Sequence, residues 1–538
     1  MDLRLPIAEP SEAERAAIDS VLGPPAPEGD RVARAERNDR ALLLPALRAA
    51  QRRVGWISEG ALGYVCARLD VPPAEAYGVA SFYALLSLEE RPADVLHVCT
   101  DLSCRLAGVE VPPGAHPSPC LGLCERAPAS LRTIAGPDPR ELQLPEAGPP
   151  LPQAGQSGLR LLRRIAAGVD PESLDAYLAE GGFAARELGP EDVVAAVSAS
   201  GLLGRGGAAF PTGTKWEAVA RQPARPHYLV CNADESEPGT FKDRVLMESD
   251  PFALLEALTI AAYATGCQRG FIYVRAEYPL AHARLENAME QLRARGLLGG
   301  DFDVELRIGA GAYVCGEETA LFQSIEGYRG EPRNKPPFPV EVGLFGKPTV
   351  VNNVETLVNV PLILDGDIRD TRLFCVSGHV ARPGLYEVEL GTPLHELLDL
   401  AGACPPKAVL LGGAAGSFLR PDQLDLPLSF EGARAAGTTL GSGVVIVFDE
   451  SADLVDAVLR IAEFFRDESC GQCVPCRVGT IRQLEALQRL TNGGANGDER
   501  EVLADLAQVM RDASICGLGQ TAASAVSSAI ENLGVLGS

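Results

Sequence analysis

Residues 468–477 read ESCGQCVPCR and place Cys470, Cys473 and Cys476 at two-residue intervals. A fourth cysteine, Cys516, follows far downstream in the segment SICGLG. One tight loop with three thiolates and one remote cysteine suit a 4Fe–4S cluster. The alternative is a structural zinc ion, but four-cysteine zinc sites usually pair two CxxC knuckles. The spacing therefore favours a cluster held between helices, and a chain that moves electrons one at a time.

A second set of cysteines lies nearer the N-terminus, as Cys99-x4-Cys104 and Cys120-x3-Cys124. Two such pairs could hold two irons bridged by two sulfides, each iron taking one pair. Zinc is again the alternative. The chain has 14 cysteines, and its first residues lack the basic and apolar regions of a signal peptide. We therefore expect metal or redox roles for the cysteines rather than disulfides.

The composition argues against some classes of function. A net charge of −24 over 538 residues disfavours nucleic acid as the main partner, because phosphate contacts need clustered Lys and Arg. The most apolar run, residues 252–266, contains Glu256 and is too short to span a bilayer. We expect a cytoplasmic protein with no membrane span, which could lie on the inner membrane only through partner subunits.

The texture of the sequence changes several times along the chain. Residues 1–40 are polar and are expected to begin loosely ordered, whereas residues 41–88 have the apolar spacing of helices. Alternating strand and helix patterns after residue 190 indicate a mostly parallel sheet covered by helices. The predicted domains are a helical and cysteine-containing domain at 1–132, a linker at 133–175, an α/β domain at 176–368, a small β-rich domain at 369–450 and a helical domain at 451–538.

A glycine-rich loop opens the α/β segment, with the sequence GRGGAAFPTGTKW at residues 204–216. Glycines such as Gly204, Gly206 and Gly207 let backbone amides approach a phosphate, and Arg205 or Lys215 can neutralise it. The loop follows a helix rather than a strand, so it is not a standard Rossmann fingerprint. Taken alone, it could be a flexible turn.

Polar groups at other points of the α/β segment strengthen a nucleotide site. The motif NADESEPG directly follows a predicted strand at 227–231, so its side chains fall at the carboxyl edge of the sheet, where α/β folds bind ligands. A solvated turn is the alternative for these acidic groups. The further candidates are Phe210 in the glycine loop; Asn232, Asp234, Glu235 and Glu237; Tyr313, Gly316, Glu317 and Glu318; Lys335 and Phe338; and Asn352 and Asn353.

Together these motifs resemble the NADH-binding flavoprotein subunit of respiratory complex I and its diaphorase relatives in formate dehydrogenases and hydrogenases. The resemblance covers residues 180–538 through GRGGAAFPTGTKW, NADESEPGTFKDR, GAYVCGEETAL, NKPPFP, VNNVET and ESCGQCVPCR, in the family's order. Residues 41–130 resemble the small 2Fe–2S subunit of the same enzymes. The implied fold is multidomain α/β: a helical segment with an abbreviated thioredoxin-like domain, a Rossmann-like FMN and NADH domain, a β-grasp (ubiquitin-like) domain and a C-terminal helical bundle that carries a cluster.

The resemblance also implies residue roles. FMN would lie against the loop 204–215, near Asn232, Asp234, Tyr313, Gly316, Asn352 and Asn353. NADH would stack on it between Phe210 and Phe338, with Glu237, Glu318 and Lys335 contacting the dinucleotide. Acidic groups near the adenosine ribose would favour NADH over NADPH.

The implied activity is hydride transfer between NAD(H) and FMN, followed by release of single electrons through the 4Fe–4S cluster. No side chain need act as an acid or base. The electrons would pass to other subunits, an iron–sulfur relay subunit and a catalytic or membrane subunit. A subunit that has lost catalysis and only docks partners is the alternative, and the parent complex stays open.

Two positions depart from the family's pattern. Ala209 stands where a glycine is common in the loop, and its methyl group could crowd the flavin. Only 15 residues separate Cys104 from Cys120, whereas the family usually has a spacer at least twice as long. We therefore expect a 2Fe–2S cluster in a trimmed thioredoxin-like domain.

Overall fold

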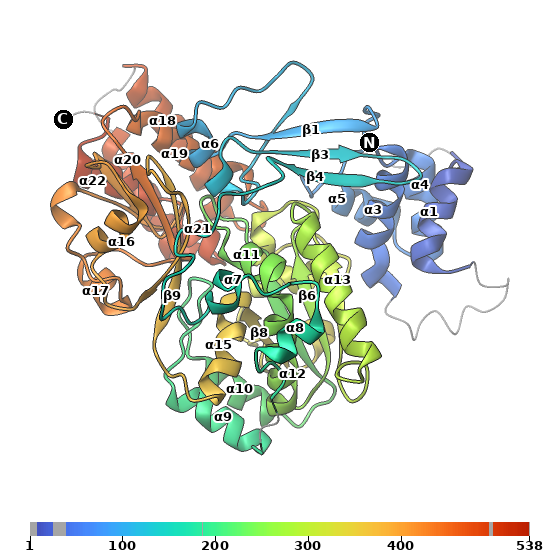
Figure 1. Ribbon diagram of the computed structural model, residues 1–538. Coiled ribbons are helices and arrows are strands. Elements are labelled where there is room, and N and C mark those ends of the chain that lie inside the picture. The colour runs from blue at the N-terminus through green and yellow to red at the C-terminus, as the bar shows by residue number, and fades with distance from the viewer. Residues whose placement is uncertain (1–7, 25–38, 185–186, 494–498, 537–538) are drawn as a thin grey trace.

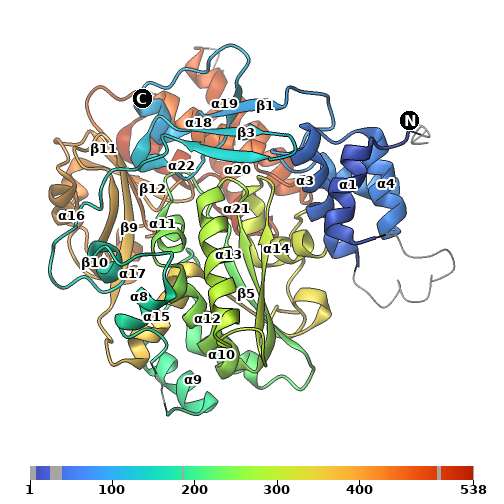
Figure 2. The ribbon, with the colours of Figure 1, turned by 45° about the vertical axis from the view of Figure 1, so that its right-hand side comes forward.

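The computed structural model describes residues 8–24, 39–184, 187–493 and 499–536. The N-terminal helices lie at one end of the molecule and the C-terminal helices at the other (Figure 1). A small sheet runs between them across the top of a larger helix-covered sheet (Figures 1 and 2). No helix within the described ranges combines the length and the apolar character needed to cross a lipid bilayer.

The predicted helical pattern of residues 41–88 is confirmed as far as Ala80, and residues 81–88 form turns and bends. The helices of the N-terminal part of the chain are α1 (Glu12–Leu22), η1 (Asp39–Leu42), α3 (Leu43–Val54), α4 (Glu59–Leu69) and α5 (Pro73–Ala80). The expectation of loose order at the start of the chain is wrong for residues 12–22. There Ser11 accepts a hydrogen bond from the Glu14 amide while the Glu14 carboxylate accepts one from the Ser11 amide, a capping box readable as S-x-x-E. The rest of that expectation, for residues 1–7 and 25–38, lies outside the described residues.

The sheet at the top carries the first cysteine set. Its strands are β1 (Asp94–Cys99), β2 (His116–Ser118), β3 (Ser130–Ile134) and β4 (Arg140–Leu144), in the order β2-β1-β3-β4. The short helices α6 (Leu102–Leu106) and η2 (Cys124–Arg126) complete this part. The sheet continues to Leu144 and so enters the segment predicted as linker at 133–175. Prolines on both sides of β4 hide this five-residue strand from a reading of composition.

The larger sheet is four-stranded and parallel, as predicted, in the order β7-β6-β5-β8. The strands β5, β6 and β7 follow one another in one direction across the sheet, whereas β8 is added on the other side of β5. Ligands bind at the carboxyl ends of the strands where the strand order reverses in this way. Its strands are β5 (His227–Ala233), β6 (Cys267–Val274), β7 (Asp303–Ile308) and β8 (Thr349–Asn353). The helices of this part of the chain are α7 (Arg163–Ala166), α8 (Leu174–Ala179), α9 (Pro190–Ala199), α10 (Thr212–Ala220), α11 (Lys242–Ser249), α12 (Pro251–Thr265), α13 (Pro279–Ala294), η3 (Tyr313–Gly316), α14 (Glu318–Ile325), η4 (Leu344–Gly346) and α15 (Val354–Leu364). Helices such as α12 and α15 pack against the sheet.

The β-rich segment forms a third sheet in the order β10-β9-β13-β11-β12, with β9 and β13 parallel. Its elements are β9 (Thr371–Gly378), β10 (Gly384–Glu389), α16 (Leu394–Ala401), β11 (Ala408–Leu411), β12 (Ser417–Leu419), η5 (Pro421–Gln423), α17 (Phe430–Ala435) and β13 (Val444–Phe448). The C-terminal helices are α18 (Leu454–Asp467), α19 (Val474–Thr491), α20 (Glu499–Ala513), α21 (Gly517–Thr521) and α22 (Ser524–Leu533). The Ser528 hydroxyl accepts a hydrogen bond from the Phe418 amide at 2.9 Å, which joins α22 to β12.

Candidate functional site

The sequence motifs of the α/β domain meet at the carboxyl edge of its sheet. The Asn232 side-chain amide at the end of β5 donates to the Gly316 carbonyl at 2.7 Å. A Cβ added at Gly206 would lie 3.2 Å from the Cβ of Asn353, at the end of β8. The Trp216 indole N–H donates to the Asn352 side-chain oxygen at 2.8 Å. The structure thus gathers four motifs that lie far apart in the sequence.

Two aromatic rings are exposed in this region. Phe210 is 50% exposed and Phe338 is 52% exposed, although apolar rings of this size are usually buried. Lys215 Nζ lies 5.7 Å from the centre of the Phe210 ring. An exposed ring with a cation beside it, as at Phe210, suits stacking against a nucleotide.

Lys215 also belongs to a group of lysines and carboxylates. Lys335 Nζ contacts Glu317 Oε1 at 2.9 Å and Glu318 Oε1 at 2.7 Å, and Lys215 Nζ lies 3.7 Å from Glu318 Oε2. Burial opposes the charge on Glu318, but Lys215 and Lys335 outweigh it and lower the pKa of this carboxyl. Glu318 is therefore an ionised acceptor that could bind hydroxyl groups.

Two candidate residues have side chains engaged elsewhere. The Glu235 carboxylate accepts hydrogen bonds from the Asp243 and Arg244 amides, both at 2.9 Å, and so caps the start of α11. Burial raises the pKa of this carboxyl to about 8. The Arg205 guanidinium faces Asp370 and lies 5.9 Å from the centre of the Phe430 ring, toward the β-rich domain. These contacts give both side chains a structural role that the sequence did not predict.

Glu237 lies between two domains. Its Oε2 accepts a hydrogen bond from the Ser442 hydroxyl at 2.6 Å, and its Oε1 accepts one from the Ala415 amide at 3.1 Å. Burial raises the pKa of this carboxyl. The candidate therefore already bonds to the β-rich domain, and its contact with a dinucleotide stays a prediction.

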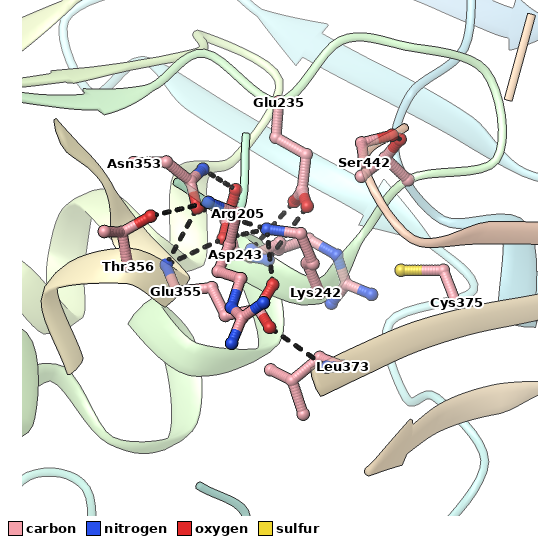
Figure 3. A network of polar contacts seen from close by, with 12 residues as sticks. Arg205, Glu235, Lys242, Asp243, Asn353, Glu355, Thr356, Leu373, Cys375 and Ser442 are labelled. Atoms are coloured by element: carbon pink, nitrogen blue, oxygen red, sulfur yellow. Dashed lines mark hydrogen bonds and ion pairs between the residues drawn. The ribbon is translucent and has the colours of Figure 1, made fainter. Parts of the chain in front are cut away.

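A buried polar network, which sequence reasoning missed, supports Asn353 (Figure 3). Lys242 is fully buried, and its Nζ contacts Asp243 Oδ1 at 2.8 Å and Glu355 Oε2 at 3.1 Å. Asn353 Nδ2 donates to Asp243 Oδ2 at 2.6 Å, and Glu355 Oε1 accepts a bond from the Leu373 amide at 3.0 Å. The network fixes the end of β8 against α11 and β9. The only sequence signal was the position of Lys242 and Asp243 at the end of the motif NADESEPGTFKDR.

The glycine loop fits a flat ligand that approaches the backbone. Gly207 has φ +116, in the left-handed region that glycine tolerates. A Cβ added at Gly316 would lie 3.4 Å from the Asp234 carbonyl oxygen. The loop that contains Gly316 and the loop that contains Asp234 therefore approach each other closely at a residue without a side chain. Ala209 also lies in the left-handed region, at φ 52. The position where the family prefers glycine is thus a strained one here, and not only a crowded one.

The cysteine loop at 470–476 lies between α18 and α19, as predicted. Cys476 falls in the first turn of α19, and Cys516 directly precedes α21. Burial raises the pKa of the Cys470 and Cys516 thiols, and the backbone N–H groups of Gln472 near Cys470 and of Leu518 and Gly519 near Cys516 act in the opposite direction. Such N–H donors favour the thiolate form that a cluster needs. Burial raises the pKa of the Cys476 thiol to about 12 and of the Cys516 thiol to about 11, so iron must displace these protons.

The carboxyl edge of the parallel sheet, where FMN is predicted to bind and which we call the flavin edge, touches this cysteine loop directly. The Tyr313 amide donates to Glu468 Oε2 at 2.8 Å, and the Tyr313 ring lies 5.0 Å from the Phe464 ring on α18. Arg329 Nη2 donates to the Cys470 carbonyl at 3.3 Å. A group bound at the sheet edge and a group bound by these cysteines would therefore be close neighbours.

The four N-terminal cysteines also come together, despite the short spacer. Cys99 ends β1, Cys104 lies in α6, and Cys120 and Cys124 flank a loop that packs beside them. The Cys120 and Cys124 sulfurs are 3.4 Å apart, and the Gly122 amide donates to the Cys120 sulfur at 3.4 Å. The neighbouring thiols of Cys104 and Cys120, together with burial, raise the pKa of the Cys99 thiol. All four are buried, so the set fits a small dry cluster site.

Models of four protein families match successive parts of the chain. They are the thioredoxin-like [2Fe-2S] ferredoxin at residues 30–111, the Nuo51 FMN-binding domain at 197–362, the SLBB domain at 373–414 and the NADH-ubiquinone oxidoreductase-F iron-sulfur binding region at 456–534. These matches confirm FMN and the two iron–sulfur clusters over the zinc alternatives. The ferredoxin match ends before Cys120 and Cys124, so the ligand set of that cluster stays a prediction.

Known proteins resemble most of the chain. The HndC subunit of an NADP-reducing hydrogenase from Solidesulfovibrio fructosivorans is 43% identical over 68% of this chain and 79% of its own length. A subunit of the Aquifex aeolicus NADH-quinone oxidoreductase is 42% identical over 70% of this chain and 93% of its own length. A crystal structure of an air-oxidised NAD+-reducing [NiFe]-hydrogenase covers 93% of this chain and 94% of the matched chain, with a TM-score of 0.79 and 32% identity.

The parallel sheet with its flavin edge, the two cysteine sites and the β-grasp-like domain between them define an iron–sulfur flavoprotein that exchanges electrons with a nicotinamide nucleotide. The chain belongs to the family of NADH-binding flavoprotein subunits that includes HndC and the matched subunits of NADH-quinone oxidoreductases, here with a thioredoxin-like 2Fe–2S domain at its N-terminus. The predicted multidomain fold and the expected NADH oxidoreductase activity are therefore confirmed.

Gly519→Ala should remove the 4Fe–4S cluster selectively. A Cβ at this position would lie 2.4 Å from Ser514 Oγ and 2.8 Å from the Cβ of Cys476, and such overpacking costs about 1–3 kcal/mol. We expect a loss of iron and of the 4Fe–4S electron paramagnetic resonance (EPR) signal, with FMN content unchanged. Gly517→Ala is the matched control, because nothing lies within 4 Å of its added Cβ. Equal iron in both variants would contradict the predicted site.

Ala209→Gly should stabilise the flavin loop. A left-handed backbone costs an L-residue about 1–2 kcal/mol, and glycine gives back part of that gain, about 0.5–1 kcal/mol, in unfolded-chain entropy. We expect a small rise in the temperature at which FMN is released, measured by flavin fluorescence. Ala208→Gly is the control, because residue 208 is not at positive φ and should only lose stability. A fall of the same size in both variants would argue against strain at residue 209.

Proposed function

We propose that this chain is the electron-input subunit of a larger redox complex. It exchanges a hydride between NAD(H) and FMN and passes single electrons through a cluster on Cys470, Cys473, Cys476 and Cys516. The observation that carries the proposal is the contact between the flavin edge and the cysteine loop, through the Tyr313 amide and the Glu468 carboxylate. FMN, when bound, supplies the change from two-electron to one-electron chemistry.

The residues at the sheet edge bind and orient in this proposal. Phe210 and Phe338 would enclose the dinucleotide, because both rings are half exposed and each belongs to a motif that also supplies a lysine of the lysine–carboxylate group, Lys215 and Lys335. Glu318, held ionised by Lys215 and Lys335, would accept bonds from ribose hydroxyls and repel a 2′-phosphate. This charge would favour NADH over NADPH, and that preference stays a prediction. Asn232, Asp234, Gly316, Asn352 and Asn353 would surround the flavin.

The surface beside the 4Fe–4S site supports a docking partner. Three apolar side chains at helical spacing on α19 are exposed, namely Val474 at 58%, Val478 at 43% and Ile481 at 42%, and Val509 on α20 is 53% exposed. Gathered apolar exposure of this kind marks interaction sites, and this stripe starts beside Cys473. We propose that an iron–sulfur relay subunit docks here and takes the electrons.

The identity of the parent complex is also part of the proposal. The structure-based match to an NAD+-reducing hydrogenase spans the whole fused arrangement, which favours a hydrogenase or a formate dehydrogenase over complex I. The catalytic or membrane subunit would then lie beyond the relay subunit. A cytoplasmic location stays a prediction.

A subunit that only docks partners is the rival, and NADH-dependent turnover, measured before and after Glu318→Gln, separates the two. Loss of one charge-assisted hydrogen bond costs about 1.5–3 kcal/mol, so we expect kcat/KM for NADH to fall roughly 10- to 100-fold and discrimination against NADPH to weaken. The assay is NADH-dependent ferricyanide reduction by FMN- and iron-loaded protein. Glu305→Gln, on the exposed end of β7, is the control. Absence of NADH-dependent turnover from the unmodified protein would favour the docking role, and unchanged turnover in Glu318→Gln would show that Glu318 does not contact the dinucleotide.

Val478→Glu should weaken assembly without affecting the flavin. A charge placed in the apolar stripe on α19 would have to be desolvated on docking. We expect less relay subunit to copurify, while ferricyanide reduction by the separate chain is unchanged. Ile368→Glu is the matched control, because Ile368 is 71% exposed and lies outside the stripe. Undiminished copurification of the relay subunit with Val478→Glu would place the docking surface elsewhere.

A further inference from the structure

The loop with the second N-terminal cysteine pair, residues 120–124, is held mainly by side chains from other domains. Its own sheet offers little support, since β2 has three residues and α6 has five. A Cβ added at Gly122 would lie 2.1 Å from the hydroxyl of Tyr278, in the flavin domain. The loop is therefore pressed against that domain. Three buried arginines approach it, namely Arg244, Arg275 and Arg460.

Arg275 joins this loop to the flavin edge. The residue directly follows β6 and is 4% exposed. Its Nη2 donates to the Cys120 carbonyl at 2.7 Å, and its Nη1 donates to the Glu235 carbonyl at 2.9 Å. Glu235 belongs to the motif NADESEPG that follows β5. The Arg275 guanidinium therefore bonds both to Cys120 of the N-terminal cysteine site and to a loop of the flavin edge. Glu277 pairs with Arg275 Nη2 at 2.9 Å.

Arg244 holds the same loop from α11. The side chain is fully buried, and its Nε donates to the Gly122 carbonyl at 2.9 Å. It also pairs with Glu125, and with Glu248 at 2.7 Å. Two guanidiniums of the flavin domain thus bond to consecutive parts of one cysteine loop.

The third arginine comes from the C-terminal helices. Asp101 Oδ2 accepts a hydrogen bond from the Cys120 amide at 3.0 Å, and Asp101 Oδ1 contacts Arg460 Nε at 3.3 Å. Arg460 lies on α18, the helix that ends just before the Cys470 loop. The loop is therefore fixed from both neighbouring domains, and Arg275 makes the only direct bridge among these three arginines between Cys120 and the flavin edge.

We propose that Arg275 is a positioning residue for the 2Fe–2S cluster, which fixes residues 120–124 to the flavin edge and raises the cluster's reduction potential. The potential of an iron–sulfur cluster depends on nearby charge and hydrogen bonding. A buried cation one carbonyl away from a ligand cysteine favours the added electron, because water does not screen it there. The inference rests on the proposed ligand set Cys99, Cys104, Cys120 and Cys124.

The test is a redox titration of the full-length FMN- and iron-loaded protein, followed by EPR. In Arg275→Gln we expect the 2Fe–2S potential to shift to more negative values, or that signal alone to be lost, with the 4Fe–4S signal and FMN unchanged. Arg275→Lys should keep a potential nearer that of the unmodified protein, because it keeps the charge. Arg164→Gln is the control, since Arg164 is a largely buried arginine that pairs with Asp250, and its structural contacts lie away from the cysteine loop.

Glu277→Gln gives a test of opposite sign that does not remove the arginine. Neutralising this partner leaves the Arg275 charge uncompensated, so the 2Fe–2S potential should shift to more positive values. If Arg275→Gln loses every cofactor, the potential measured in Glu277→Gln decides whether the inference holds. An unmoved potential in Glu277→Gln, or a full 2Fe–2S signal at the unmodified potential in Arg275→Gln, overturns the inference. Absence of any 2Fe–2S signal from the unmodified protein would instead overturn the proposed ligand set, and with it this inference.

Discussion

The hydrogen bond from the Tyr313 amide to the Glu468 carboxylate joins the α/β domain to the C-terminal helical domain. Electron transfer between the two predicted cofactor sites depends on this junction. Tyr313 belongs to a loop at the carboxyl edge of the parallel sheet, and Glu468 stands two residues before the first cysteine of the C-terminal site. The neighbouring contact of the Tyr313 and Phe464 rings seals the same junction. Because a parallel sheet collects its loops at one edge, the helical domain needs to dock only there to bring a cluster close to the flavin.

Buried charged side chains hold the carboxyl edge of the parallel sheet together, and they fix its geometry more than they add to its stability. Lys242, Asp243 and Glu355 form a dry ion network under Asn353. Such a network adds little net stability, because desolvation offsets the attraction, yet removing one partner costs about 3–5 kcal/mol. The carboxylates thus fix where β8, α11 and β9 meet. Glu235 and Glu237 act similarly, the first at the start of α11 and the second at Ser442 in the β-grasp-like domain.

The sequence predicts what is encoded locally. Cysteine spacing, glycine-rich loops and strand patterns are short-range signals, and they located both cysteine sites and the parallel sheet. The orientation of Arg205 toward Asp370 and the bonds of Arg275 to Cys120 link residues far apart in the chain, so no local pattern contains them. The helix α1 differs from these cases, because its capping box at Ser11 and Glu14 is a local signal. The polar composition of residues 1–40 nevertheless pointed to loose order.

The trimmed 2Fe–2S domain illustrates what fusion on one chain permits. A separate subunit must fold its cysteine loop against its own hydrophobic core. The strand β2, with three residues, and the helix α6, with five, provide only a small core for that purpose. Here Arg244, Arg275 and the Asp101–Arg460 pair provide that support from the neighbouring domains. A covalent link keeps those domains at a high effective concentration around the loop, so the spacer between Cys104 and Cys120 can shorten without releasing the cysteines. Folding of the small cluster site then depends on the flavin domain, and its electronic properties depend on that domain's arginines.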